Sequence, residues 1–191
     1  SYCNGRKSID GMPSILSSIP MFIEPFFLTP ASMNDVSGIA GELKNKGYYS
    51  AFFHGAENGS MGFQAFARKT GFIDYFGRTE YDADKRFDGD KDFDGMWAIW
   101  DEPFLQFFAT KMSEFKQPFV SAVFTASSHH PYKVPEKYKD IYKEEGIAIH
   151  KCIRYTDNAL RLFFEKAKTQ PWYENTLFVI TSDHTNLSDH A

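Results

Sequence analysis

Three short runs of almost continuous apolar or β-branched residues constrain the fold of this 191-residue chain most strongly. They lie at residues 48–54, 119–125 and 176–181, and such runs are typical of strands covered on both faces of a parallel sheet. Apolar spacing and terminal glycines predict helices between them, at residues 10–18, 36–46, 64–70, 103–115 and 147–168. Strands that alternate with helices predict an α/β fold, with a mostly parallel central sheet flanked by helices.

Two helix boundaries depend on single residues. Pro13 is compatible with a helix only in the first turn, so the helix at residues 10–18 is expected to begin close to it. Asn34 and Asp35 are predicted to cap the helix at residues 36–46, which Gly47 would close. The length of the chain favours a single domain.

Each predicted strand ends in a loop that carries histidine. His54 ends the first strand, the second is followed by His129 and His130, and the third by Asp183 and His184. The carboxyl ends of parallel strands share one edge of the sheet, where α/β proteins bind ligands. Carboxylate and imidazole are ligands for divalent metals, and neighbours can share one ion where the strand pleat has ended. The simpler alternative is that each histidine only leaves a strand or begins a turn.

Ser8 is the candidate nucleophile. It follows Arg6 and Lys7 in the sequence GRKSID and lies near the start of a predicted helix, where backbone N–H groups and the helix dipole favour phosphate. A metal ion held by Asp183 and His184 would assist loss of the hydroxyl proton, and cations would hold the phosphoryl oxygens. The alternative is that Ser8 is only a helix N-cap.

Five segments together resemble the lipoteichoic acid synthase group of sulfatase-like proteins, which belongs to the alkaline phosphatase superfamily. The segments are GRKSID, AFFHG, SSHHPY, RYTD and TLFVITSDH, and they occur in this order through nearly all of the chain. The resemblance implies an alkaline phosphatase-like fold, with Ser8 as both nucleophile and metal ligand and with Asp183 and His184 as further ligands. It also implies that His129 contacts the substrate phosphate and that His54 lies near the donor head group.

The same resemblance implies a metal-dependent phosphoryl-type transferase. It would act on a phosphodiester head group, phosphoglycerol or similar, through a covalent intermediate on Ser8. One divalent ion (manganese, magnesium or zinc) and a phospholipid or other phosphodiester substrate are expected. The intact protein would have membrane helices outside this chain and a catalytic domain on the extracytoplasmic face of a bacterial membrane. Hydrolysis of a phosphodiester or of a sulfate ester is the alternative within the superfamily.

The chain also departs from the group's pattern. No strand ending in an acid precedes Ser8, and the group's last strands are missing, so residues 1–191 are expected to be one sulfatase-like catalytic domain, incomplete at both ends. Such a piece is expected to bind its metal weakly and to self-associate through an exposed sheet edge. The loop after His54 lacks the Trp and Arg of well-studied members. The C/S-x-P-S-R sequence of classical sulfatases is also missing, which disfavours sulfate-ester hydrolysis.

An acidic loop offers an alternative of another class, a calcium-binding module. Residues 90–101, DKDFDGMWAIWD, nearly match an EF-hand loop, with Asp90, Asp92 and Asp94 at its first ligand positions. The preceding segment lacks helical apolar spacing, and the twelfth residue is Asp101 rather than the usual glutamate. The favoured interpretation is a solvated acidic loop whose tryptophans are core or lid residues.

Composition argues against other partners. The net charge is −4 and no stripe of Lys and Arg interleaved with aromatic residues occurs, so nucleic acid is not an expected partner. No apolar run approaches the roughly 18 residues of a membrane helix, so no membrane span is expected in this chain. Cys3 and Cys152 fit either free core thiols or one disulfide.

Overall fold

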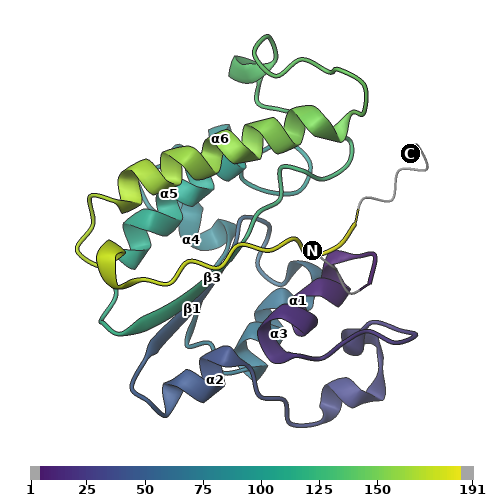
Figure 1. Ribbon diagram of the computed structural model, residues 1–191, viewed down its shortest axis with the longest axis vertical. Coiled ribbons are helices and arrows are strands. Elements are labelled where there is room, and N and C mark those ends of the chain that lie inside the picture. Colours follow the sequence, from purple (N-terminus) through teal and green to yellow (C-terminus); the bar gives the residue numbers. More distant parts are fainter. Residues whose placement is uncertain (1–4, 186–191) are drawn as a thin grey trace.

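The computed structural model describes residues 5–185 and shows a parallel sheet between two layers of helices (Figure 1). The sheet has the order β2–β1–β3, where β1 is Tyr49–His54, β2 is Asp74–Phe76 and β3 is Phe119–Phe124. One face is covered by α5 (Asp101–Met112) and α6 (Ile149–Ala167). The other is covered by α1 (Ser8–Ser17), α2 (Ile39–Lys44) and α3 (Phe63–Lys69). The predicted fold class is confirmed.

Short elements connect these layers. Helix α4 (Arg78–Ala83) follows β2, and single 3₁₀ turns occur at Phe26–Leu28, Pro30–Met33, Ser60–Gly62, Gly89–Asp92, Glu136–Tyr138 and Tyr173–Asn175. Neither β2 nor α4 is apparent in the sequence pattern. β2 has three residues, of which only Tyr75 is buried, and α4 has six, so neither is long enough to show a periodicity. No helix in the part of the chain that the structure describes is long and apolar enough to cross a membrane.

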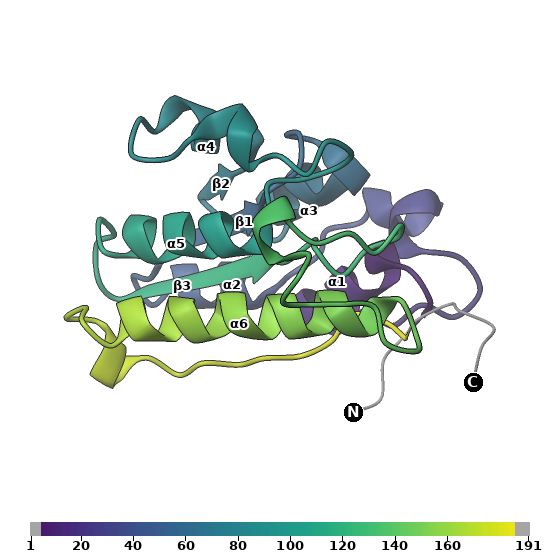
Figure 2. The same cartoon turned by 90° about the horizontal axis from the view of Figure 1, so that it is seen from above.

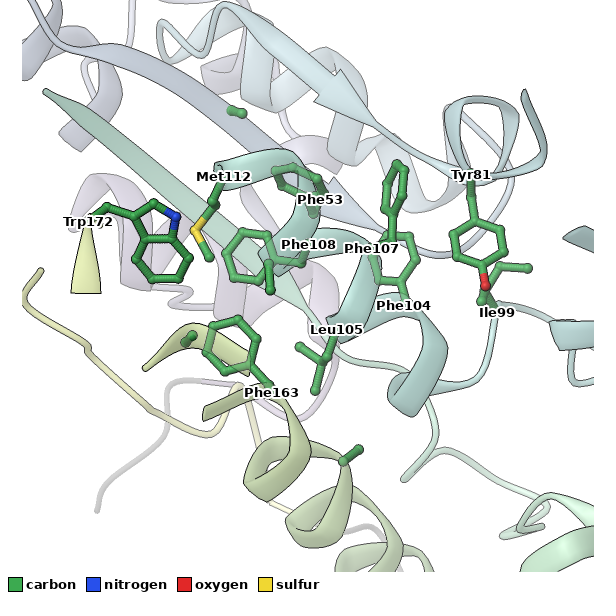
Figure 3. Close-up of a cluster of buried hydrophobic side chains, with 14 residues drawn as sticks. Phe53, Tyr81, Ile99, Phe104, Leu105, Phe107, Phe108, Met112, Phe163 and Trp172 are labelled. Atoms are coloured by element: carbon green, nitrogen blue, oxygen red, sulfur yellow. The ribbon is translucent and has the colours of Figure 1, made fainter. Parts of the chain in front are cut away.

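Neighbouring residues of β1 contribute to two separate hydrophobic cores. Phe53 faces the α5–α6 layer, where its ring centroid lies 4.8 Å from that of Phe108 and 6.0 Å from that of Phe107 (Figure 3). Phe52 faces the other layer, with its ring centroid 6.1 Å from that of Phe63. Successive residues of a strand point to opposite faces. A strand covered on both sides therefore needs the continuous apolar run that the sequence shows.

Two helices begin at other residues than predicted, for reasons that the structure shows. Helix α1 begins at Ser8 because the Asp10 carboxylate accepts a hydrogen bond from the backbone N–H of Lys7 and so caps the first turn. Pro13 consequently lies inside the helix, where it is buried and leaves out one helix hydrogen bond. Helix α2 is shorter than predicted, because the extended Gly38 occupies its N-cap position in place of Asn34 and Asp35.

The strand predicted at residues 176–181 is also wrong. This segment runs beside β3, on the side away from β1 (Figures 1 and 2), but within residues 5–185 it joins no ladder. Phe178 packs against α6, 5.1 Å from the Phe164 ring, whereas Leu177 and Val179 are 88% and 78% exposed. Only one face of the segment is covered by the described chain, so its apolar run does not become a strand buried on both faces.

Candidate functional site

The sequence-predicted site residues lie toward the edge at which the strands end. Figure 2 shows β3 pointing to the side of the molecule where α1 and the end of the yellow C-terminal segment lie. Ligand sites of open α/β sheets occupy the same edge.

Ser8 is the first residue of α1 and is only 6% exposed. The turn before it is held by Asp10, whose Oδ2 accepts hydrogen bonds from the backbone N–H groups of Arg6 and Lys7, both at 3.2 Å. Gly5 has φ +81°, and a Cβ there would lie 2.3 Å from the Asp10 Cβ, so the turn requires glycine. The GRKSID sequence thus holds Ser8 at the start of the helix, and the Arg6 and Lys7 side chains are exposed beside it.

Asp183 and His184 dock against the first turns of α1. Gly11 permits this contact, because a Cβ at that position would lie 2.6 Å from the backbone oxygen of Asp183. The approach brings His184 Nε2 to 3.4 Å from Ser8 Oγ. Lys7 occupies the N-cap position of α1, so the hydroxyl of Ser8 does not serve as the helix cap. We call Ser8, Asp183 and His184 the Ser8 group.

The protonation of His184 follows from its neighbours. Its Nδ1 lies 2.7 Å from the backbone oxygen of Thr185, which can only accept a hydrogen bond. Nδ1 therefore carries a proton. In the neutral form of the ring, Nε2 has a lone pair that suits either acceptance of the serine proton or coordination of a metal ion.

Two distances within the Ser8 group match the spacing of ligands around a divalent metal ion. His184 Nε2 lies 3.4 Å from Asp183 Oδ2, the same separation as from Ser8 Oγ. In a tetrahedral site with metal–ligand bonds of about 2.0–2.2 Å, neighbouring ligand atoms are about 3.4 Å apart. No cluster of three His, Cys, Asp or Glu side chains suited to a metal occurs within residues 5–185, so this set depends on the serine hydroxyl as its third ligand.

His54, at the end of β1, is 0% exposed. Its ring centroid lies 5.1 Å from those of Phe63 and Phe124 and 5.3 Å from that of Trp97, and neither ring nitrogen has a hydrogen-bond partner among the described residues. Burial lowers the pKa of His54 to about 4, and the nearby Phe124 backbone opposes only part of this shift. The imidazole is therefore neutral at pH 7 and lies beneath Trp97 rather than in the open.

His129 is exposed in the loop that follows β3. Its Nδ1 lies 2.7 Å from the backbone oxygen of His130, so Nδ1 is the donor in that contact. The His129 ring lies 4.7 Å from the Trp97 ring, which also contacts His54. The two predicted histidines therefore both contact Trp97, and within residues 5–185 no hydrogen bond connects them to the Ser8 group.

Asp101 is a site residue that the sequence pattern does not reveal. Its buried carboxylate accepts hydrogen bonds from the backbone N–H groups of Ala126 (2.8 Å) and Ser127 (3.1 Å) and from the Thr156 hydroxyl (2.8 Å). Burial raises the pKa of Asp101, against the hydrogen bonds that lower it. The sequence WDEP indicates an acid near a helix start. It does not indicate the partners of this acid, Ala126 and Thr156, which lie 25 and 55 residues away.

The carboxylates of the EF-hand-like loop are used separately. Asp90 pairs with Arg78. Asp92 Oδ2 accepts a hydrogen bond from the Tyr81 hydroxyl at 2.6 Å. Asp94 accepts hydrogen bonds from backbone N–H groups of its own turn. Helix α4 ends at Ala83 and a 3₁₀ turn, Gly89–Asp92, lies within the loop itself, so no helix leads directly into Asp90 as in an EF-hand. The three carboxylates have separate partners instead of a common one.

Cys152, predicted as either a free thiol or half of a disulfide, is free and buried. Its thiol donates a hydrogen bond to the backbone oxygen of Lys133 at 3.3 Å, and burial raises the pKa of the thiol to about 11. Its predicted alternative partner, Cys3, lies outside the described residues.

Comparison with known proteins identifies the family. The Sulfatase family model matches residues 1–190. The chain belongs to the sulfatase family. Among its relatives, lipoteichoic acid synthase-like YvgJ from Bacillus subtilis (strain 168) is 31% identical over 152 residues, 77% of this chain and 24% of that protein. Phosphoglycerol transferase I from Escherichia coli (strain SMS-3-5 / SECEC) is 24% identical over 201 residues, 96% of this chain and 25% of that protein.

A solved structure extends the similarity to the fold. The crystal structure of a protein in the alkaline phosphatase superfamily from Vibrio parahaemolyticus matches with a TM-score of 0.76 at 27% identity, covering 90% of this chain and 41% of that chain. The resemblance found in the sequence is confirmed, and the sulfatase-family chain is related to transferases and synthases. It spans about a quarter of the length of the two curated relatives.

Proposed function

We propose that this sulfatase-family chain supplies the nucleophile and part of the metal site of a phosphoryl-type transferase that acts on a phosphodiester head group. The observation that carries the proposal is the approach of His184 Nε2 to Ser8 Oγ at 3.4 Å, with Asp183 beside both. A buried serine hydroxyl beside an imidazole nitrogen matches the requirement for an activated nucleophile. Residues 1–191 would all belong to one sulfatase-like catalytic domain.

The Ser8 group would hold one divalent ion, for which manganese, magnesium and zinc are candidates. When bound, the ion supplies positive charge that lowers the pKa of a hydroxyl ligand and neutralises charge on phosphoryl oxygens. Asp183 contributes a charged ligand that Gly11 allows to lie against α1. The Nδ1 hydrogen bond of His184 to Thr185 fixes the orientation of the imidazole.

Transfer would proceed in two steps. Ser8 loses its proton and its Oγ bonds to phosphorus as the bond to the lipid alcohol breaks, and the leaving alcohol takes up a proton. A hydroxyl of the acceptor, or water, then attacks the phosphorus and releases Ser8. The burial of the hydroxyl favours such a step because electrostatic stabilisation is stronger where water is excluded.

The remaining predicted residues would hold the substrate. Arg6 and Lys7 are exposed cations directly before Ser8, where they can neutralise a phosphodiester. His129 lies in an exposed loop and is proposed to contact the phosphate by donating a hydrogen bond from Nε2. His54 is neutral and covered, so it would reach a donor head group only where Trp97 moves aside.

The names of the relatives suggest the substrate class. One is a phosphoglycerol transferase and another is lipoteichoic acid synthase-like, so we take a phosphoglycerol head group of a phospholipid as the donor. The intact protein would act on the extracytoplasmic face of a bacterial membrane. Hydrolysis of a phosphodiester or a sulfate ester is the alternative outcome at the same site.

The test is substitution of the nucleophile in the full-length protein. Ser8→Ala should abolish turnover of a phosphoglycerol lipid and of an aryl phosphodiester. Ser14→Ala, in the same helix, should leave turnover largely intact. Retained turnover in Ser8→Ala would return Ser8 to a structural role, and turnover of an aryl sulfate alone would favour the sulfatase alternative. Manganese titration of His184→Gln should show weaker binding than the wild type.

A further inference from the structure

The loop after β3 is held by a carboxylate from another element. Asp101 begins α5, is 2% exposed, and uses both carboxylate oxygens. Oδ1 accepts the backbone N–H groups of Ala126 and Ser127, and Oδ2 accepts the hydroxyl of Thr156 on α6. The backbone N–H of Asp101 in turn donates to Ser127 Oγ at 2.9 Å. These four hydrogen bonds join the start of α5, the loop and α6.

The loop held in this way carries His129, two residues beyond Ser127. It also forms one wall of a cavity of about 100 Å³, whose lining includes Trp97, Trp100, Ser127, His129, His130 and Lys133. Trp97 and Trp100, which line the other side of the cavity, belong to the segment that leads directly into α5. Asp101 therefore connects the loop that carries His129 to the segment of Trp97, whose ring the His129 ring contacts.

We propose that Asp101 is a positioning residue for His129, acting through the backbone of Ala126 and Ser127. The inference rests on the proposed function, in which His129 contacts the phosphate. Without the carboxylate, the buried N–H groups of Ala126 and Ser127 lose their acceptor, and the Thr156 hydroxyl keeps only its 3.3 Å contact to Ser128 Oγ. Moving the loop toward water would satisfy these N–H groups. A displacement of about 1 Å of a group that contacts the substrate can lower the rate about 100-fold.

The hydrogen bonds at position 101 require a carboxylate and not only a side chain of similar size. An ionised carboxyl accepts at both oxygens, which suits two adjacent N–H groups on one oxygen and a hydroxyl donor on the other. Asparagine retains one oxygen for the two N–H groups but presents an NH₂ toward Thr156, whose hydroxyl must then accept. Asp101→Asn should therefore keep part of the function, whereas Asp101→Ala removes every acceptor.

The experiment compares three variants in the full-length protein, with metal supplied and well below their melting temperatures. Asp101→Ala should lower kcat by about 100-fold with a smaller change in KM. Asp101→Asn should recover most of this loss, by restoring the two N–H contacts. Glu102→Gln is the matched control, because the neighbouring Glu102 side chain pairs with the exposed Lys137, farther along the connection to α6, and makes no hydrogen bond to Ala126, Ser127 or His129 in the described chain; it should keep wild-type kcat.

A second readout does not depend on activity. Hydrogen exchange at the amides of Ala126 and Ser127, and the ring resonances of His129, should change in Asp101→Ala and remain near wild type in Glu102→Gln. Wild-type kcat in a folded Asp101→Ala, or a fall in kcat with no change at these amides, would overturn the inference. Should Asp101→Ala fail to fold, the double variant Asp101→Asn/Thr156→Val, which removes the contact to α6 as well, should have a kcat clearly below that of Asp101→Asn, and wild-type kcat in this double variant would overturn the inference.

Failure of this inference is distinguishable from failure of the proposed function. If Ser8→Ala retains turnover, the proposed function fails, and the exchange and ring resonances alone decide whether Asp101 positions His129. If Ser8→Ala abolishes turnover while Asp101→Ala does not reduce it, only the role of Asp101 is refuted.

Discussion

The burial of His54 has a measurable consequence for the pH dependence of stability. The imidazole is fully buried among Phe63, Trp97 and Phe124, and neither ring nitrogen is hydrogen-bonded. Burial lowers its pKa from 6.5 to about 4, so the folded protein binds this proton only at low pH. The unfolded chain binds it near pH 6.5. Between these two values the unfolded state holds more protons, so the free energy of unfolding must fall as the pH falls.

The size of the effect follows from the two pKa values. The difference between 6.5 and about 4 corresponds to about 3 kcal/mol once the pH is below both values. Between pH 7 and pH 5 about 2 kcal/mol of this is lost. For a urea m-value of about 2 kcal/mol/M, the loss moves the unfolding midpoint by about 1 M.

The assay is urea unfolding of the wild type and of His54→Phe at pH 7 and pH 5, followed by tryptophan fluorescence. The larger ring of His54→Phe can introduce packing strain, but this strain is the same at both pH values and cancels in the difference. The variant should therefore lose about 2 kcal/mol less than the wild type between pH 7 and pH 5. Phe63→Leu alters the same cluster and retains the imidazole, so it should show the wild-type pH dependence. An unchanged pH dependence in His54→Phe would refute the reasoning.

Two further predictions concern the core and the acidic loop. Phe53→Ala should lower the free energy of unfolding, measured in urea, by about 3–5 kcal/mol, because this side chain is 0% exposed within the α5–α6 core. Phe22→Ala, at an 86% exposed position, should change it by less than about 0.5 kcal/mol. Calorimetry should detect no specific calcium site at Asp90, Asp92 and Asp94, because each has its own partner; a micromolar site removed by Asp92→Ala would contradict this.

The elements that could be predicted from the sequence are those whose burial is two-sided or strongly periodic. β1 and β3 agree with the predicted runs at residues 48–54 and 119–125 to within one residue at each end. Helices α3, α5 and α6 lie close to their predicted ranges, because each has an apolar face several residues long. β2 could not be predicted from the sequence, since a three-residue strand is specified by its pairing with β1 and not by a pattern of its own.

The environment of a side chain was harder to predict than its place along the chain. His54 lies at a strand end, as predicted. Its burial, however, depends on Trp97, which is 43 residues further along the chain. Asp101 was read as a deviant twelfth position of a calcium loop, whereas its partners come from β3's loop and from α6. Neither contact leaves a local pattern in the sequence.

Ser8 and His184 lie close together as predicted, although the segment that leads to His184 is not the paired strand that the sequence predicts. The run at residues 176–181 was predicted as a paired strand, and the structure gives it no ladder within the described chain. An extended segment nevertheless advances about 3.3 Å per residue whether or not it is paired. It therefore carries Asp183 and His184 past the end of β3 to α1, where Gly11 lets the backbone approach. The direction and length of the segment, rather than its hydrogen bonding, determine which residues meet at the edge of the sheet.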